Sequence, residues 1–203
     1  EVFFTDVRVP KENLIGERGG GFILSQVRLG PGRIHHATRW LAEAERAFDM
    51  LCERTKSRTS FGKGYEKHQM IQEYIADSRM ELEMAKLLTL RAAWRMDKDG
   101  HHAARADIAM VKVNNAKVLY NVIDRALQVH GSLGYSCDMP LELMYRSARM
   151  AHLVDGANEV HKVTIAREEL KRYEAVEGWP SEHIPTRREA SLKRFAHLLE
   201  ARG

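Results

Sequence analysis

The stretch HLVDGANEVHKV, residues 152–163, contains one acidic residue between an apolar segment and a glycine. Asp155 follows an apolar approach and directly precedes Gly156. Apolar surroundings raise the pKa of a carboxyl group above its ordinary value of about 3.9, and this suits a general base that removes a proton from a substrate. The alternative is structural, because an aspartate just before a helix commonly caps the first amides of that helix. This stretch alone leaves both interpretations open.

A second stretch, RTSFGK at residues 58–63, could bind a pyrophosphate. Arg58 offers a planar and permanently charged fork of hydrogen-bond donors. Phe61 and Gly62 form a bare, tight corner beside this arginine. For so short a stretch in isolation, the favoured interpretation is a polar turn between two helices that happens to contain an arginine.

A third stretch, QVHGSLGY at residues 128–135, combines a helix end with glycines. Gln128 falls in the last expected turn of a helix, just before Gly131 and Gly134. Without side chains at the glycines, backbone amides could approach a ligand closely. Taken alone, the stretch indicates only the C-terminal cap of a helix.

Composition limits what these stretches can mean. The chain has 203 residues, of which 44% are hydrophobic, and Lys plus Arg (32) slightly outnumber Asp plus Glu (28). The net charge of +4 favours an anionic ligand such as a nucleotide or coenzyme A, while the absence of long one-sign blocks gives no indication of nucleic-acid binding. Cys52 and Cys137 are far apart, so neither a disulfide framework nor a zinc ribbon is expected, and a reducing compartment is the default. No apolar run is long enough for a membrane span, and the first residues do not resemble a targeting signal.

Apolar residues at steps of three, four and seven predict long helices joined by short turns. Pro31 should kink the first helix or loosen one of its turns, and Gly131 should end the third. No Glu-x-x-His occurs, so a di-iron or other metal site is not expected in the bundle. The expected helices lie at about 21–55, 66–96, 102–131, 140–150, 158–173 and 187–201.

These elements predict an all-α fold, a four-helix bundle with a short N-terminal β remnant. Residues 1–18 read as one strand that breaks at Pro10, and a single strand is not stable alone, so we expect its sheet partners upstream. The predicted organisation is therefore the end of a β-domain with a linker at 1–18, the bundle at 19–174, and a linker with a helical tail at 175–203.

In this order, the three stretches resemble the C-terminal bundle of the acyl-CoA dehydrogenases, which are flavoenzymes. The shared pattern is RxxFG after a long helix, QxxGxxGY at the end of a third helix, and DG before a helix that begins NEVHK. FFTDVRVPKENLIGERGGGF resembles the last strand of that family's middle β-domain and the entry to its first bundle helix. LGPGRIHH resembles a branch that includes larger proteins with a kinase-like domain. The resemblance covers residue 1 to about residue 174.

The resemblance implies a cofactor site shared between subunits. Arg58 and Phe61 would reach the FAD of a neighbouring subunit, and Ser60 would add a hydroxyl contact. Gln128 and Gly131 would face the adenosine diphosphate part of the same cofactor. The resemblance therefore also implies a homodimer or a homotetramer.

It implies a second group of residues near the reaction. Asp155 would be the catalytic base, and Gly156 would lie with it beside the flavin and the acyl thioester. Ala157 and Glu159 occupy positions where relatives often have Thr and Gln in contact with FAD. Arg33 matches a family arginine near the active site and the substrate.

The implied reaction is the α,β-desaturation of an acyl-CoA thioester, in which a base removes the α-proton and FAD accepts the β-hydride. Most relatives carry Glu where this chain has Asp155, which is shorter by one methylene, roughly 1.5 Å. Misplacement by about 1 Å can cost about a hundredfold in rate, so either the backbone has moved or the protein is slow. Some relatives carry the base on the first bundle helix, but the matching residue here, Gly32, cannot serve.

The expected partners are an acyl-CoA substrate and an electron-transfer flavoprotein that reoxidises the flavin. A bacterial cytoplasm is the favoured location, or the mitochondrial matrix or a peroxisome in a eukaryote. These residues alone could be inactive, because the upstream domains would complete the walls of the site. The alternative function is a noncatalytic helical bundle for oligomer assembly or partner binding.

Overall fold

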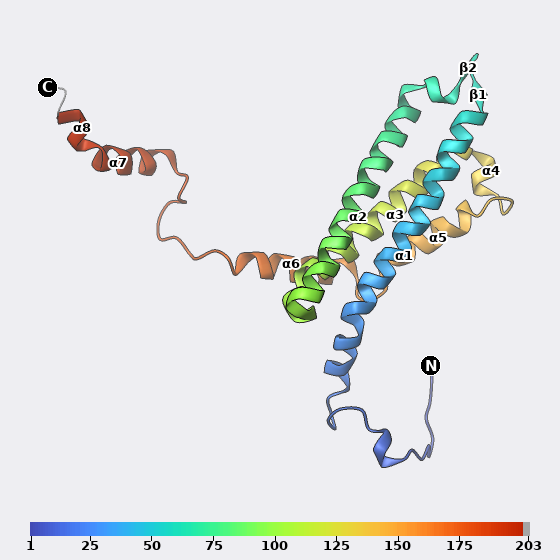
Figure 1. Cartoon of the computed structure of the whole chain (residues 1–203), viewed down its shortest axis with the longest axis horizontal. Helices are drawn as coiled ribbons and strands as arrows, with labels where there is room; N and C mark the ends of the chain where they lie inside the picture. Colours follow the sequence, from blue (N-terminus) through green and yellow to red (C-terminus); the bar gives the residue numbers. More distant parts are fainter. Residues whose placement is uncertain (201–203) are drawn as a thin grey trace. The chain divides into compact units, whose positions relative to one another are not determined.

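The computed structural model describes residues 1–200, most of which are helical (Figure 1). The chain divides into two units, residues 1–166 and the residues from 167 onward, and the division falls inside the sixth α-helix. In chain order the elements are η1 (Lys11–Asn13), α1 (Gly21–Ser57), β1 (Thr59–Ser60), β2 (Lys63–Gly64), η2 (Tyr65–Lys67), α2 (Gln69–Ala103), α3 (Arg105–His130), α4 (Ser132–Tyr135), α5 (Leu141–Ala151), α6 (Asn158–Leu170), α7 (Ile184–Arg194) and α8 (Ala196–Glu200).

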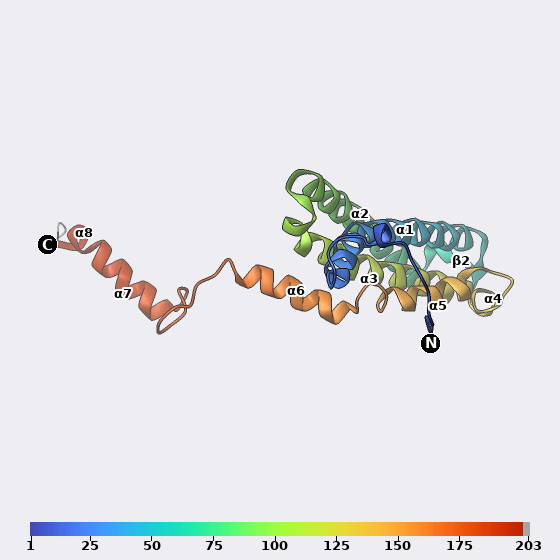
Figure 2. The ribbon, with the colours of Figure 1, turned by 90° about the horizontal axis from the view of Figure 1, so that it is seen from below.

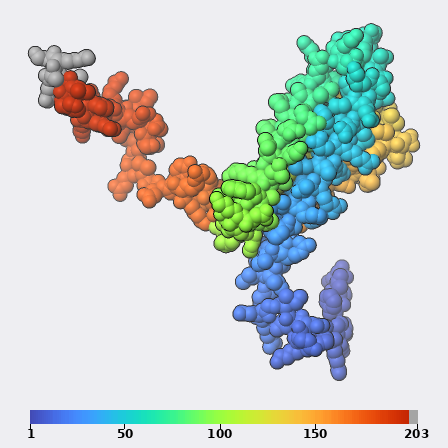
Figure 3. Space-filling model, viewed as in Figure 1, coloured from blue at the N-terminus to red at the C-terminus, as the bar shows by residue number. Residues whose placement is uncertain are grey.

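The predicted four-helix bundle is confirmed in the first unit. Helix α3 packs against α1, α2 and α5, and α1 also packs against α2. The four helices run beside one another in both ribbon views (Figures 1 and 2). In the space-filling view the atoms of α1 and α2 meet along much of their length (Figure 3). Within residues 1–200, no helix has the length and apolar character needed to cross a lipid bilayer.

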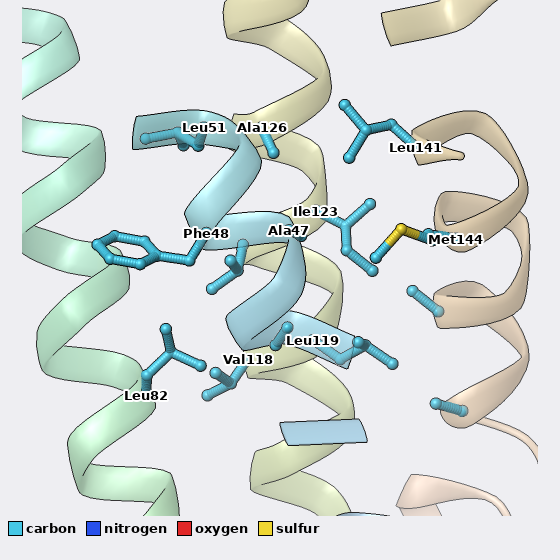
Figure 4. Packing of buried hydrophobic residues seen from close by; sticks show 14 of the residues in the cluster. Ala47, Phe48, Leu51, Leu82, Val118, Leu119, Ile123, Ala126, Leu141 and Met144 are labelled. Atoms are coloured by element: carbon cyan, nitrogen blue, oxygen red, sulfur yellow. The ribbon is translucent and has the colours of Figure 1, made fainter. Parts of the chain in front are cut away.

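The core of the bundle lies where these helices face one another (Figure 4). Leu51 of α1, Leu82 of α2, and Leu119 and Ile123 of α3 are at most 1% exposed. Burying each such side chain contributes roughly 1.5–3 kcal/mol. Fully buried alanines on the facing surfaces, Ala47 among them, leave room for the helices to approach closely. The apolar periodicity of the sequence therefore predicts the packed faces.

Helix α1 runs through Pro31 from Gly21 to Ser57, which confirms the predicted helix over about 21–55. Proline removes one backbone N–H donor, which leaves one carbonyl a turn earlier without its helical partner. Pro31 and Val27 are both exposed, so water can hydrate that carbonyl. The cost is small enough for the helix to continue.

Helix α2 ends later than the sequence predicted. It continues through the segment DKDGHH, and its one non-helical residue is Gly100, with φ of 82° and ψ of 162°. Glycine takes such a conformation without steric cost, so the helix resumes beyond it for one short turn. Further along the chain, α3 stops at Gly131, with φ of 67°, as predicted. The single turn α4 directly after it was not predicted.

The predicted N-terminal strand is absent. Residues 1–18 contain only the short helix η1, and their side chains are exposed, including Phe3 (77%) and Phe4 (83%). A strand needs backbone partners, and the described part of the chain pairs none with these residues. The sequence pattern alone could not supply that partner.

The residues from 167 onward form the second unit, which contains the end of α6 together with α7 and α8. The predicted single helix at 187–201 begins earlier, at Ile184, and is interrupted at Phe195. Residues 201–203 lie outside the described residues. In the turn before α7, Trp179 and His183 stack with ring centroids 4.5 Å apart.

Candidate functional site

The loop between α5 and α6 carries the predicted acid in a strained conformation. Asp155 has φ of 57° and Gly156 has φ of 96°, so both adopt the left-handed region. For a residue other than glycine this conformation costs free energy and persists only where neighbouring groups enforce it. The backbone N–H of Asn158 donates to the His152 carbonyl at 3.0 Å and closes the loop. Such strain is concentrated at functional sites.

Three side chains hold Asp155. Its carbonyl oxygen accepts a hydrogen bond from Arg33 Nε at 3.0 Å and lies 3.1 Å from His161 Nε2. Its carboxylate Oδ2 pairs with His36 Nδ1, and the Asp155 side chain is 13% exposed. The first amide hydrogen bonds of α6 go to the carbonyl of Ala157. The observed contacts of the carboxylate therefore differ from those of a helix cap.

A cavity of about 590 Å³ opens beside this carboxylate. Asp155, His36 and Trp40 line it together with Val154 and Met150, so the acid faces a partly apolar space. The complete lining also includes Arg39, Glu43 and Ser147. An apolar chain of moderate length would find both apolar side chains and the Asp155 carboxylate here.

A second cavity, of about 470 Å³, carries positive charge. Arg33 and His161 line it, and both also contact the carbonyl of Asp155, which lines the first cavity. Burial lowers the pKa of both side chains, and the Asp155 charge opposes this effect. No acidic side chain lines this second cavity, whose other basic residues are His101, His102 and Arg105.

A lysine lies beneath the Asp155 loop. Lys112 of α3 is 0% exposed, and its Nζ donates to Asn158 Oδ1 at 2.7 Å and to the His152 carbonyl at 3.3 Å. Burial lowers the pKa of Lys112 to about 8, while the charges of Asp155 and Glu159 oppose the shift. The loop therefore rests on a buried group that is still protonated at neutral pH.

The predicted Arg58 stretch folds into a small hairpin. Thr59 pairs with Gly64 and Ser60 with Lys63, and the two residues between them have positive φ, 49° at Phe61 and 75° at Gly62. Two left-handed residues form the tight turn that matches the twist of a hairpin. Phe61, at the tip of the hairpin, is 97% exposed. A large apolar side chain held outward by a tight turn is available to another molecule.

Arg58 joins this hairpin to the end of α3. Its Nη1 donates to the carbonyls of Val129 and His130 at 3.3 and 3.5 Å, and the guanidinium stacks 4.8 Å from the centre of the Tyr65 ring. A Cβ atom at Gly131 would lie 3.5 Å from the same Nη1. A cation at a helix C-terminus is stabilised by the free carbonyls and the helix dipole. Arg58 therefore has a structural role, whatever else it binds.

A third cavity, of about 420 Å³, brings Ser60, Phe61 and Gln128 together. Aromatic side chains of Tyr65 and Tyr74 form part of its wall. Within this chain, the cavity shares no lining residue with the two cavities at Asp155. The predicted site residues therefore separate into two groups. The first lies around Asp155 and Arg33, and the second lies around Ser60, Phe61 and Gln128.

Ala157 and Glu159 belong with the first group by position, since Ala157 directly precedes α6 and Glu159 lies in its first turn. Glu159 is exposed and lines none of the three cavities described above. Among residues 1–200, no cluster of three or more His, Cys, Asp or Glu side chains could hold a metal ion.

Two residues at the site were not predicted from the sequence. His36 lies three residues after Arg33 on α1, so helix geometry places both on one face, and this spacing was a usable signal. Lys112 follows Val111 within the apolar pattern of α3, where a buried polar residue indicates a specific partner. Neither signal identified Asp155 or Asn158 as that partner, because these contacts join distant parts of the sequence.

Comparison with known proteins gives the family. Residues 19–170 match the family model described as "Acyl-CoA dehydrogenase, C-terminal domain". The chain is 46% identical over 172 residues to the Mycobacterium tuberculosis protein "Probable acyl-CoA dehydrogenase FadE2", covering 85% of this chain and 42% of that protein. It is 48% identical over 171 residues to "Acyl-CoA dehydrogenase family member 11" of Rattus norvegicus, covering 84% of this chain and 22% of that protein.

A solved structure agrees with these sequence relatives. The butyryl-CoA dehydrogenase of Megasphaera elsdenii superposes with a TM-score of 0.76 at 35% identity, over 82% of this chain and 43% of that chain. The chain thus spans less than half the length of each of these three proteins. Because the family model matches most of its residues, the chain belongs to the acyl-CoA dehydrogenase family, in which it corresponds to the C-terminal helical domain.

Proposed function

We propose that the chain is the C-terminal domain of an FAD-dependent acyl-CoA dehydrogenase, with Asp155 as the base that removes the α-proton. One observation carries the proposal: Asp155 is held in a left-handed conformation with its largely buried carboxylate on the wall of a partly apolar cavity. A general base needs a defined position and limited access to water. The geometry supplies both.

The chain's own residues would handle the proton. The α C–H bond breaks, its proton passes to the Asp155 carboxylate, and its electron pair forms the new double bond as hydride leaves the β-carbon. His36 holds Oδ2 of that carboxylate, and Arg33 fixes the Asp155 backbone. When bound, FAD would supply the acceptor for the hydride. Asp155 would later release its proton to solvent.

The positively charged cavity fits the coenzyme A part of the substrate. Coenzyme A carries phosphate groups, and Arg33, His101, His102 and Arg105 line a cavity without any acidic side chain. Arginine binds phosphate oxygens through its fork of donors. Because Arg33 also contacts the Asp155 carbonyl, it would connect the thioester end of the substrate with the base. Gly156, beside Asp155, has φ of 96°, and a Cβ atom there would lie 3.2 Å from His161 Nε2, so glycine lets the loop pass close to this ring beside the expected thioester position.

The hairpin cavity fits part of a dinucleotide. Phe61 and the tyrosines of its wall offer stacking surfaces, while Ser60 and Gln128 offer polar groups. Arg58 and Gly131 adjoin this region through the contact described above. We propose that these residues hold the adenosine diphosphate part of FAD, whereas Ala157 and Glu159 lie near its flavin end. Since the two groups share no cavity in one chain, the cofactor would span two subunits.

This arrangement predicts a homodimer, or a homotetramer made of two dimers. Light scattering of the full natural protein that contains this chain should give at least twice the mass of one subunit. A strictly monomeric protein that still retains FAD would contradict the shared site. We further propose an electron-transfer flavoprotein as the acceptor that reoxidises FAD, on the basis of the family resemblance.

A second function, assembly without catalysis, is favoured by one observation. Helix α2 exposes a row of large apolar side chains at helical spacing, Met80, Met84, Leu87 and Trp94. A row of this kind commonly marks an interaction surface. This surface is compatible with either function, because an oligomeric dehydrogenase also needs interfaces.

The flavin content of the full natural protein separates the two functions. If the proposal is correct, the purified protein is yellow, with a flavin absorption band. Adding acyl-CoA esters of increasing chain length without oxygen should bleach this band, and the best ester identifies the acyl group. A colourless protein that binds neither FAD nor acyl-CoA would favour assembly alone.

Replacement of Arg58 by alanine should weaken FAD binding. Loss of charge-assisted hydrogen bonds worth about 1.5–3 kcal/mol corresponds to a roughly 10- to 150-fold higher dissociation constant. Fluorescence titration of the FAD-free protein measures this change. Lys56→Ala is the matched control, because it removes an exposed positive charge near the end of the same helix.

Because Arg58 also contacts the end of α3, Gln128→Ala provides an independent test. Gln128 lines the hairpin cavity without those contacts, so its loss should also raise the FAD dissociation constant while the melting temperature stays unchanged. Wild-type affinity in both variants would leave the Arg58 stretch as a structural turn.

A further inference from the structure

Lys112 is a buried group with no role in the reaction described so far. Its side chain is 0% exposed, yet the two acceptors of its ammonium group are both uncharged, the amide oxygen of Asn158 and the carbonyl of His152. Burying a cation without a hydrogen-bonded carboxylate costs free energy that a leucine or methionine at this position would avoid. Stability of the bundle alone does not explain the lysine.

Both acceptors belong to the loop that carries Asp155. His152 lies three residues before Asp155 and Asn158 three residues after it, so the ammonium group of Lys112 joins the two ends of the loop. Asn158 also contacts His152 directly, with Nδ2 2.8 Å from the ring Nδ1. Lys112, His152 and Asn158 thus form a closed network, which we call the Lys112 clamp.

The clamp has a rigid base. Lys112 lies within α3, the helix that packs against α1, α2 and α5, and its neighbour Val111 is fully buried. At the middle of the loop, Arg33 and His161 hold the Asp155 carbonyl. A left-handed aspartate would relax if its loop were free, so the conformation needs support at the ends of the loop as well as at Asp155.

We propose that Lys112 is a positioning residue, which acts through the clamp to hold the Asp155 loop in the conformation that the base requires. This inference rests on the proposed function of Asp155. Lys112 itself does not touch the reacting atoms. Its ammonium group fixes both ends of the loop, and a shift of about 1 Å at a catalytic group can cost about a hundredfold in rate.

Two variants of the full natural protein test the clamp. Lys112→Met keeps a long apolar side chain and removes the donor, while Asn158→Leu removes the main acceptor and keeps a similar size. Each should lower kcat, measured per bound flavin, by roughly tenfold to a hundredfold, with KM within about threefold of the wild type. Because both remove the same contact, the double variant should be little slower than the slower single variant.

A second readout follows the loop itself. Hydrogen–deuterium exchange of peptides that cover residues 152–158 should be faster in both variants, while peptides from the centre of α3 keep their protection. Lys117→Met is the matched control, because Lys117 is an exposed lysine on the same helix, and it should change neither kcat nor loop exchange. This readout does not depend on activity.

The outcomes distinguish this inference from the proposed function. Wild-type kcat and loop exchange in both Lys112→Met and Asn158→Leu would overturn the clamp, even if Asp155 proves essential. Faster loop exchange with kcat unchanged would also overturn it, because the loop would then be held without effect on the base. If Asp155→Asn remains active, the proposed function itself fails.

Discussion

Asp155→Asn should abolish most acyl-CoA-dependent flavin reduction in the full natural protein while the fold and the bound flavin survive. Asparagine has nearly the same size and is among the residues that tolerate the left-handed conformation found here, φ of 57°. It cannot accept the α-proton, and loss of a general base typically costs about 10²- to 10⁴-fold in rate. Stopped-flow measurement of flavin bleaching gives this rate, with flavin content and melting temperature as controls.

Proton removal can be measured separately from hydride transfer. An acyl-CoA analogue with sulfur in place of the β-carbon can lose an α-proton but has no β-hydride to transfer. In D₂O the wild type should exchange its α-protons for deuterium, as followed by NMR, and Asp155→Asn should not. Normal exchange in that variant would place the base elsewhere.

Two further variants sharpen this test. Glu43 is the other carboxylate on the cavity wall, and Glu43→Gln should lower the rate far less than Asp155→Asn. The reverse order would make Glu43 the base. Asp155→Glu keeps a carboxylate at this position, so it should retain measurable activity, because a proton acceptor is still present.

The helical bundle was predictable because its signals are local. Apolar periodicity fixes which faces of α1, α2 and α3 are buried, and Gly131 ends α3 because its own backbone adopts a conformation that glycine favours. The N-terminal strand differs, since a strand depends on partners that were expected upstream of this chain, so that strand stays a prediction. Helix α1 continues through Pro31 as predicted, and the exposure of Pro31, which its immediate sequence does not show, lets water hydrate the carbonyl that loses its helical partner.

The candidate site divides in the same way. Asp155 and Arg58 could be identified as candidate site residues from sequence patterns. The comparisons established the family of the chain without testing the roles of these two residues. The partners of Asp155 could not be selected so directly. His36 lies 119 residues away from it in the sequence, and Lys112 meets Asn158 across 46 residues. Such contacts depend on how the helices pack, so local sequence patterns do not predict them.

Lys112 should make the folded protein more stable as the pH rises from 7.5 to 9.5. Burial lowers its pKa in the folded protein to about 8, from the ordinary value of 10.5. Between these values the unfolded chain binds a proton that the folded protein has released, so the free energy of unfolding increases with pH. This increase in the free energy of unfolding is negligible below about pH 8 and should reach about 2 kcal/mol by pH 9.5.

Urea unfolding followed by the helix signal at pH 7.5, 8.5 and 9.5 measures this gain, with Lys112→Met as the reference. The quantity that decides is the difference between the two proteins, because other alkaline groups are common to both. The hydrogen bond with Tyr120 raises the pKa of Tyr145 to about 12 in the folded protein. Above pH 10 the unfolded chain loses this proton while the folded protein keeps it, so the free energy of unfolding falls, and the measurements stop below that pH. A difference that stays constant from pH 7.5 to 9.5 would mean that Lys112 keeps its proton when folded. The charges of Asp155 and Glu159 would then cancel the effect of burial on the pKa of Lys112.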